Sequence, residues 1–285
     1  MISIIIRAKN EERNIGGVLE AIFSQDISQS IEVIIVDSGS TDRTLDIAGQ
    51  FSVKILTIAE SRFSYGYALN LGISASSGDI ICCLSAHCVP AHHKWLSKLI
   101  GPIAEGRSHA TYGRQVPIPG VNPFEEVSLK KHFPDQDTIT GRVPFSNANC
   151  AFFKKIWLEQ KFDEELSSWE DYLWFSLLKD KYVFSYAPLA AVCHSHPFSL
   201  SSTLRRTFND GQTFRIMKDR YNLDLVDETA PTLLAKLRFF LKDILDHFKL
   251  FIDKRYVLFI LTVPFVRILT FKAYRDGYNS VEKTD

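Results

Sequence analysis

Short apolar runs alternate with amphipathic stretches along the first part of the chain. Four runs rich in β-branched residues are typical of buried strands, over residues 2–6, 31–36, 53–58 and 80–84. Between them, apolar residues recur at helical spacing, over 15–22, 44–51 and 67–76. This order predicts a Rossmann-like α/β fold, with a mostly parallel sheet and helices on both of its faces.

Polar clusters follow three of these predicted strands, at residues 7–12, 37–42 and 85–90. The carboxyl ends of parallel strands meet at one edge of a sheet, and ligands bind outside that edge in open α/β sheets. We therefore expect a binding site built from these three clusters.

The middle of the chain is less regular. Prolines and a glycine mark a long loop between Pro117 and Pro123. A helix is expected from Trp169 to Leu178, and a further strand over 183–192 ends just before two histidines, His194 and His196.

The character of the chain changes from about Pro231, where apolar helical faces are interspersed with Lys and Arg. The apolar stretch 256–271 is broken by Pro264 and Arg267, and it falls short of the ~20 clean apolar residues of a spanning helix. Two interpretations have the same periodicity: an amphipathic segment on a membrane surface, or helices packed on the preceding domain. We predict a first domain over 1–225 and a C-terminal helical appendage over 226–285.

Composition narrows the possible partners. Lys+Arg and Asp+Glu are balanced at 33 each, which gives no support to nucleic-acid binding. The five cysteines form no CxxC pair, so a structural zinc site is not expected, and the chain lacks the zones of a signal peptide at its start. We expect a cytoplasmic protein.

Four sequence blocks occur in one order along the chain, and together they resemble glycosyltransferase family 2. The blocks are residues 5–12 (IIRAKNEE), 36–42 (VDSGSTD), 68–79 (ALNLGI with SSGD) and 169–171 (WED). The likeness covers roughly residues 1–215. It implies a GT-A fold, a nucleotide-diphosphate sugar donor and inversion at the anomeric carbon. Many members of that family build bacterial surface polysaccharides.

The resemblance assigns donor-nucleotide contacts to Arg7, Glu12 and Asp37, and Arg62 matches a position that often faces the donor. Asp37 ends a predicted strand, where its carboxylate can accept hydrogen bonds from a base or a ribose. Capping of the next helix by Ser40 or Asp42 would not explain Asp37, which precedes the turn.

The expected Asp-x-Asp metal motif of the family is Ser85-Ala86-His87 here. Ser85 offers the donor site only a neutral oxygen, so His87 is the strongest candidate ligand for Mn²⁺ or Mg²⁺. In similar Asp-x-His variants a later histidine completes the site, and His194 or His196 matches that position, of which we favour His196.

The alternative for His87 is a hydrogen-bonding residue in a site without metal. Arg205 and Arg206 would then neutralise the diphosphate, unless they belong to a solvated helix face.

Glu170 and Asp171 are the candidate catalytic pair. An inverting transfer needs one base for the acceptor hydroxyl, and the resemblance points to Asp171, with Glu170 orienting the acceptor or a neighbouring side chain. The alternative is a pair of acidic residues favoured by the helix dipole. Asn147 and Asn149 are candidates for recognising acceptor hydroxyls, since amides both donate and accept.

These residues favour an inverting glycosyltransferase that uses a nucleotide-sugar donor and a glycan or lipid-linked glycan acceptor, with peripheral contact to the inner face of the cell membrane. A catalytically decayed sugar-nucleotide or carbohydrate-binding protein is the alternative, supported by the altered metal motif. A nucleotidyltransferase would favour a Gly-rich basic phosphate loop near the N-terminus, and the sequence has none there.

Overall fold

The computed structural model describes residues 1–136, 145–223, 242, 244–245, 248 and 261–281. The chain divides into two compact units. The first comprises residues 1–118, 129–165 and 170–195, and the second comprises 119–128, 166–169 and 196–285. Each unit is described by itself below.

The first unit is built on one eight-stranded sheet with the order β3-β2-β1-β4-β7-β6-β8-β5. Its strands are β1 (Ile2–Ala8), β2 (Ile31–Asp37), β3 (Lys54–Thr57), β4 (Ile80–Ser85), β5 (Val89–Pro90), β6 (Ala110–Pro117), β7 (Asn149–Phe153) and β8 (Phe184–His194). The four strands predicted near the N-terminus pair in parallel, as expected. The sheet is mixed beyond them, because β7 runs antiparallel to both β4 and β6.

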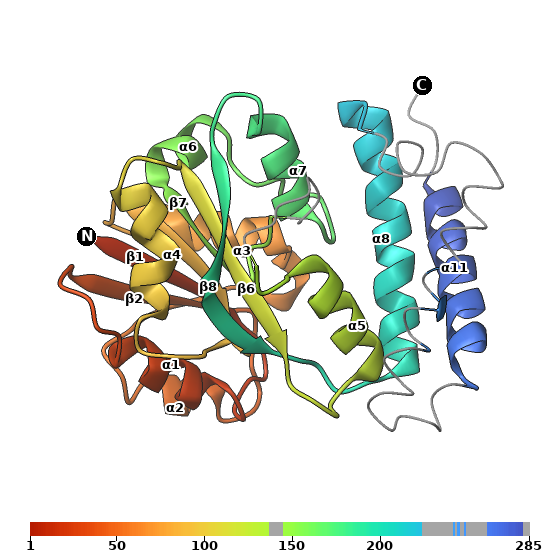
Figure 1. The fold of residues 1–285 in the computed structure, drawn as a ribbon, viewed down its shortest axis with the longest axis horizontal. Helices are drawn as coiled ribbons and strands as arrows, with labels where there is room; N and C mark the ends of the chain where they lie inside the picture. The colour runs from red at the N-terminus through yellow and green to blue at the C-terminus, as the bar shows by residue number, and fades with distance from the viewer. Residues whose placement is uncertain (137–144, 224–241, 243, 246–247, 249–260, 282–285) are drawn as a thin grey trace. The chain divides into compact units, whose positions relative to one another are not determined.

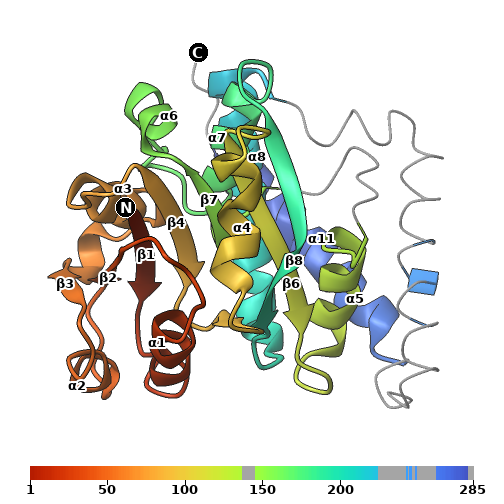
Figure 2. The same ribbon diagram turned by 60° about the vertical axis from the view of Figure 1, so that its left-hand side comes forward.

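Helices cover both faces of this sheet (Figures 1 and 2). One face packs against α1 (Ile15–Phe23), α2 (Thr44–Ala48) and α4 (Trp95–Ala104). The other packs against α3 (Tyr65–Ser74), α6 (Lys154–Glu159) and α7 (Glu170–Leu178). Side chains alternate between faces along each strand, so Cys82 joins the first core and Cys83 the second. The predicted fold class is confirmed.

A helix that the sequence analysis did not predict, α5 (Pro123–His132), begins at the last proline of the predicted loop. Pro123 occupies its first position, where the missing N–H costs nothing, and Asn122 Oδ1 accepts a hydrogen bond from the backbone N–H of Glu125 at 3.2 Å. Pro123 was therefore a helix-start signal. A short 3₁₀ helix, η1 (Glu60–Arg62), also lies between β3 and α3.

The second unit contains the helices α8 (Leu200–Tyr221) and α11 (Val263–Ser280), which lie side by side (Figures 1 and 2). Glycines make their close approach possible. A Cβ at Gly277 would collide with the carbonyl oxygen of Phe208, and one at Gly211 with that of Tyr274. No helix in the described ranges is both long and apolar enough to cross a bilayer.

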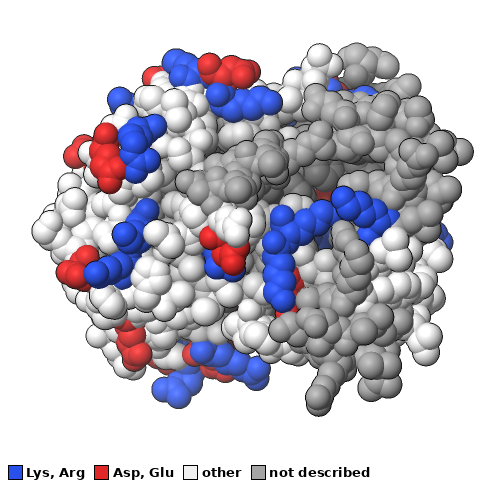
Figure 3. Space-filling view, viewed as in Figure 1, with Lys and Arg blue, Asp and Glu red and all other residues white. Residues whose placement is uncertain are grey.

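The predicted domain boundary near residue 225 lies outside the described residues, as does the apolar face predicted over 233–241. The boundary therefore stays a prediction. Charge is mixed over the described surface: on the face shown in Figure 3, Lys and Arg side chains mostly lie beside Asp and Glu side chains.

Candidate active site

Asp37 ends β2 and holds the loop that follows it. Its carboxylate is fully buried, and Oδ2 accepts hydrogen bonds from the backbone N–H groups of Gly39 (2.9 Å) and Ser40 (3.0 Å). Gly39 has φ 88°, a left-handed conformation that suits glycine. The carboxylate that the sequence assigned to the donor therefore also fixes the shape of this loop.

The loop after β1 is tied to the loop after β2 by short polar contacts. Asn10, itself left-handed with φ 54°, accepts a hydrogen bond from the N–H of Thr41 at 2.8 Å. Glu12 is exposed and accepts one from the N–H of Arg43 at 3.1 Å. The structure thus places Glu12 on the outer side of the loop pair, where it joins the two loops.

The adjacent Glu11 is the carboxylate that reaches inward. It is partly buried, and its Oε1 lies 2.8 Å from Nδ1 of His87. Its Oε2 accepts a hydrogen bond from the Asn14 side chain at 2.8 Å. The sequence analysis named Glu12, whose donor contact stays a prediction, and did not name Glu11. Both belong to the same motif, but they lie before α1, where helical periodicity does not yet indicate which side chain faces inward.

Arg7, near the end of β1, contacts the first residue of α7. Its Nη1 lies 3.7 Å from Oε1 of Glu170, and its guanidinium stacks over the Tyr65 ring at 4.5 Å from the centroid. Nη1 is buried and makes no hydrogen bond to the described residues. Arg7 is therefore a mostly buried cation beside the candidate catalytic pair, with a donor atom still able to bind an oxygen.

The two acidic residues that begin α7 are joined through Asn147. Its backbone N–H donates to Oδ2 of Asp171 at 3.0 Å, and its side-chain amide donates to Oε1 of Glu170 at 3.4 Å. The N–H of Tyr172 donates to Oδ1 of Asp171 at 2.8 Å. Asn147 is 1% exposed, so the structure places it between the two carboxylates, where it is bonded to both.

Asp171 has the properties of a base poised for proton transfer near neutral pH. Burial and the negative charge of Glu170 raise its pKa from 3.8 to about 7. Hydrogen bonds from Asn147 and Tyr172 and the charge of Arg7 act in the opposite direction. A carboxylate with a pKa near the working pH can take a proton and release it again.

Asn149, the other predicted acceptor contact, lies in the interior. It is fully buried; its amide donates to the carbonyls of Arg114 (3.2 Å) and Ala190 (2.8 Å) and accepts from the Trp95 indole at 3.0 Å. These bonds join β7 to β6, to β8 and to the helix α4. The acceptor contact stays a prediction that this arrangement does not support.

The remaining residues that the sequence suggested for donor binding differ in their exposure. Ser85 ends β4 and is 8% exposed. Arg62 lies in η1 and is exposed, with its guanidinium 4.9 Å from the centroid of the Tyr67 ring. Arg205 and Arg206 are exposed on α8.

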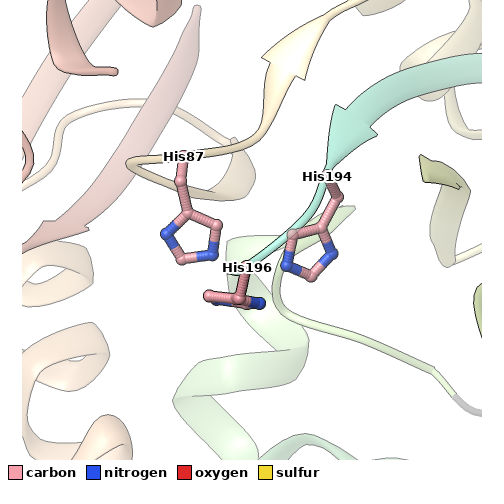
Figure 4. Close-up of side chains that lie close together, drawn as sticks. All are labelled: His87, His194 and His196. Atoms are coloured by element: carbon pink, nitrogen blue, oxygen red, sulfur yellow. The ribbon is translucent and has the colours of Figure 1, made fainter. Parts of the chain in front are cut away.

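Three histidines come together near the ends of β4 and β8, as Figure 4 shows. One ligand nitrogen from each of His87, His194 and His196 lies within 4.8 Å of the others. The rings of His87 and His194 are stacked, with 5.1 Å between centroids. Sequence reasoning left His194 and His196 as alternatives, and the structure brings both to His87.

Each of these histidines has its Nδ1 beside an oxygen that can only accept. The distances are 2.8 Å from His87 to Glu11, 2.6 Å from His194 to Gln115 and 2.8 Å from His196 to Glu125. With Nδ1 as the donor, a neutral ring has its lone pair on Nε2. This is the arrangement by which proteins fix the tautomer and orientation of metal-ligating histidines.

Comparison with known proteins defines the class of the molecule. Residues 3–162 match the family model described as Glycosyl transferase family 2. Similar solved structures are glycosyltransferases, including the mannosyltransferase PcManGT from Pyrobaculum calidifontis in complex with GDP-Man and Mn²⁺. The TM-score is 0.64 at 17% sequence identity, and the superposition covers 98% of this chain and 86% of that one. This likeness shows a GT-A fold. The chain belongs to glycosyl transferase family 2.

Two curated relatives are also glycosyltransferases. AglE of Haloferax volcanii is 41% identical over 109 residues, and the O-antigen chain rhamnosyltransferase WbaN of Salmonella anatum is 25% identical over 202 residues. The matches span 36% and 66% of this chain and 35% and 64% of those relatives. The chain therefore matches less than two thirds of the length of either relative.

Proposed function

We propose that the chain is an inverting glycosyltransferase that moves a hexosyl or deoxyhexosyl group from a nucleotide-diphosphate donor to an acceptor hydroxyl. The observation that carries the proposal is the raised pKa of Asp171 at the start of α7. Asp171 takes the proton of the acceptor hydroxyl, whose oxygen attacks the anomeric carbon from the side opposite the diphosphate. The bond from that carbon to the diphosphate oxygen breaks, the bonding pair leaves with the nucleoside diphosphate, and the configuration inverts.

Residues around the base have positioning tasks. Asn147 is bonded to both carboxylates, so it fixes their mutual geometry. Glu170 balances the buried charge of Arg7 and, through its negative charge, keeps the pKa of Asp171 high. Arg7 has a buried N–H group available for an oxygen of the donor.

For the donor we propose a site over the carboxyl ends of β1, β2 and β4. Asp37 would accept a hydrogen bond from the base or ribose in addition to those it accepts from its own loop. Glu12, Arg62 and Ser85 lie around this edge and complete the proposed donor contacts. The common position of these residues near the carboxyl ends of the strands supports the proposal that they form one donor site.

We propose that His87, His194 and His196 hold a divalent cation. The residues fit such an ion because their ligand nitrogens converge within 4.8 Å and each Nδ1–H is held by an oxygen acceptor. A cation held there would neutralise charge that develops on the departing diphosphate. Imidazole suits borderline cations such as Zn²⁺ better than Mg²⁺, which prefers oxygen ligands, so this donor set favours a transition ion.

Titration calorimetry with Zn²⁺, Mn²⁺ and Mg²⁺ tests the metal proposal without an activity assay. We expect His87→Ala to weaken binding of the preferred ion, and His93→Ala, at an exposed histidine of the same region, to leave it unchanged. Equal ion binding by both variants would refute ligation by His87. Full transfer activity in excess chelator would show that the diphosphate is neutralised by other groups, such as Arg205 and Arg206.

The acceptor is proposed to be a growing surface glycan on a lipid carrier. Three exposed apolar side chains follow one another at helical spacing along α11, Phe265, Ile268 and Phe271, and Lys272 lies beside them. Such a helix suits the interface of an anionic membrane, here the inner face of the cell membrane. The O-antigen chain rhamnosyltransferase among the relatives supports an acceptor of this class.

Flotation with anionic liposomes tests the membrane contact. Phe265→Glu with Ile268→Glu should move the protein to the soluble fraction, whereas Leu189→Glu, at an equally exposed leucine on β8, should not. A wild-type protein that never floats would refute membrane contact and point to a soluble acceptor.

A panel of UDP-, GDP- and dTDP-sugars tests the activity itself. The donor that raises the melting temperature most is incubated with the purified protein, and release of the free nucleoside diphosphate is measured. We expect slow hydrolysis or transfer that is lost in Asp171→Asn. A protein that binds the donor but never cleaves it would instead be a decayed sugar-nucleotide-binding protein.

A further inference from the structure

Asp210 lies on α8, outside the residues assigned to the donor, the acceptor and the metal. Its Oδ1 accepts hydrogen bonds from the hydroxyl of Ser168 and the indole N–H of Trp169, both at 2.9 Å. Burial raises the pKa of Asp210, while these two bonds and the charge of Arg206 lower it. A partly buried carboxylate on one helix thus holds two consecutive residues from a distant part of the chain.

Two further α8 side chains hold the same segment. The hydroxyl of Thr213, which is fully buried, lies 3.2 Å from the hydroxyls of Ser167 and Ser168. The ring of Phe214 lies 5.0 Å from the ring of Trp169. One face of α8 therefore holds residues 167–169 by hydrogen bonds and by ring packing.

The held segment has an unusual backbone. Trp169 has φ 61°, in the left-handed region that bulky residues rarely adopt. Such a conformation persists only when surrounding contacts enforce it, and it occurs often at functional sites. Glu170, the next residue, is the first of α7. The backbone turn at Trp169 therefore sets the direction in which the chain enters the helix that begins with Glu170 and Asp171.

We propose that Asp210 is a positioning residue for the transfer reaction. By holding Ser168 and Trp169, it enforces the backbone from which the two acidic side chains of α7 extend. The inference rests on the proposed function, because a fixed backbone at this point matters for catalysis only if Asp171 is the base.

Three variants test this role. Asp210→Ala removes Oδ1, the acceptor of both hydrogen bonds, whereas Asp210→Asn keeps an oxygen at that position. Asp219→Ala is the matched control, since Asp219 lies on the same helix and pairs with Arg215 at 2.5 Å. Because a displacement of about 1 Å can cost ~10²-fold in rate, we expect kcat to fall by up to ~10²-fold in Asp210→Ala. It should be largely restored in Asp210→Asn and unchanged in Asp219→Ala, and donor affinity by calorimetry should be unchanged throughout.

The pH dependence of kcat separates positioning from simple loss of fold. The folded fraction is measured by circular dichroism at each pH and divided out of the rate, because stability itself changes with pH. A displaced Asp171 changes its surroundings and moves the midpoint of this corrected profile. We expect that midpoint to shift in Asp210→Ala and to stay in Asp219→Ala. If Asp210→Ala does not fold, Trp169→Phe keeps the ring but removes the indole donor, and the same shift is expected.

A folded Asp210→Ala with the wild-type kcat and midpoint would overturn the inference, while an inactive Asp171→Asn in the same assays would leave the proposed function standing. If Asp171→Asn is fully active, the proposed function fails, and this inference fails with it.

Discussion

Replacing Asp171 by Asn should change the pH dependence of the protein's stability and lower its catalytic activity. In the folded chain, burial and the charge of Glu170 raise the pKa of Asp171 from 3.8 to about 7. The folded state therefore binds a proton that the unfolded state has released over the range between these two values. The free energy of unfolding falls with rising pH wherever the folded state binds more protons than the unfolded state. The wild-type protein therefore loses part of its stability between about pH 4 and pH 7.

The size of this effect follows from the shift. Raising the pKa from 3.8 to about 7 is a change of roughly three units, and each unit corresponds to ~1.4 kcal/mol, so the loss is at most ~4 kcal/mol. Asp171→Asn cannot titrate and lacks this slope. The difference in unfolding free energy between wild type and variant should therefore move in favour of the variant as pH rises from about 4 to 7.

Urea denaturation at several pH values measures the difference, and Asp180→Asn is the control, because Asp180 is an exposed carboxylate just beyond α7. The activity of the wild type should change with pH in the direction opposite to its stability. Loss of the base costs ~10²–10⁴-fold in kcat, and the wild-type rate should rise with pH up to about 7. Parallel stability curves for wild type and Asp171→Asn would refute the raised pKa, and near-normal turnover would remove Asp171 from the mechanism.

Three further outcomes are expected. Asp37→Ala should weaken binding of the free nucleoside diphosphate by about 1.5–3 kcal/mol in calorimetry, and unchanged affinity would count against its donor contact. Glu11→Ala should lower metal affinity by about 10–100-fold, because Nδ1 of His87 loses its acceptor; identical metal titrations would contradict this. Gly277→Val should destabilise the α8–α11 pair by about 1–3 kcal/mol or more in chemical denaturation, because its Cβ would meet the Phe208 carbonyl; wild-type stability would show that the helices can separate without cost.

The first half of the sheet was predictable because local pattern and topology agree there. Runs of β-branched residues separated by helical spacing allow little except parallel pairing, and β1 to β4 pair in that way. The antiparallel strand β7 was not predicted. Its position between β4 and β6 depends on pairing between segments far apart in the chain, which no local period records.

Residue types at the site were easier to predict than the directions of their side chains. The strand ends indicated that three polar clusters would meet at one edge of the sheet, but in loops and at strand termini a shift of one residue changes the partner. Glu11 and Glu12 illustrate this: one contacts His87 and the other joins two loops. Asn147 and Asn149 differ in the same way, since only Asn147 contacts the acidic pair.

Two carboxylates of the site, those of Asp37 and Asp171, are held in a similar way. Asp37 and Asp171 accept hydrogen bonds from the backbone of their own surroundings, two from N–H groups in each case. Such bonds fix a carboxylate before any ligand arrives, which is the preorganisation that electrostatic catalysis requires. For Asp171 they are insufficient to offset burial beside Glu170, so the residue keeps a high pKa. The chain thus holds its proposed base in place while leaving it able to take a proton, and this combination requires a sacrifice of stability at neutral pH.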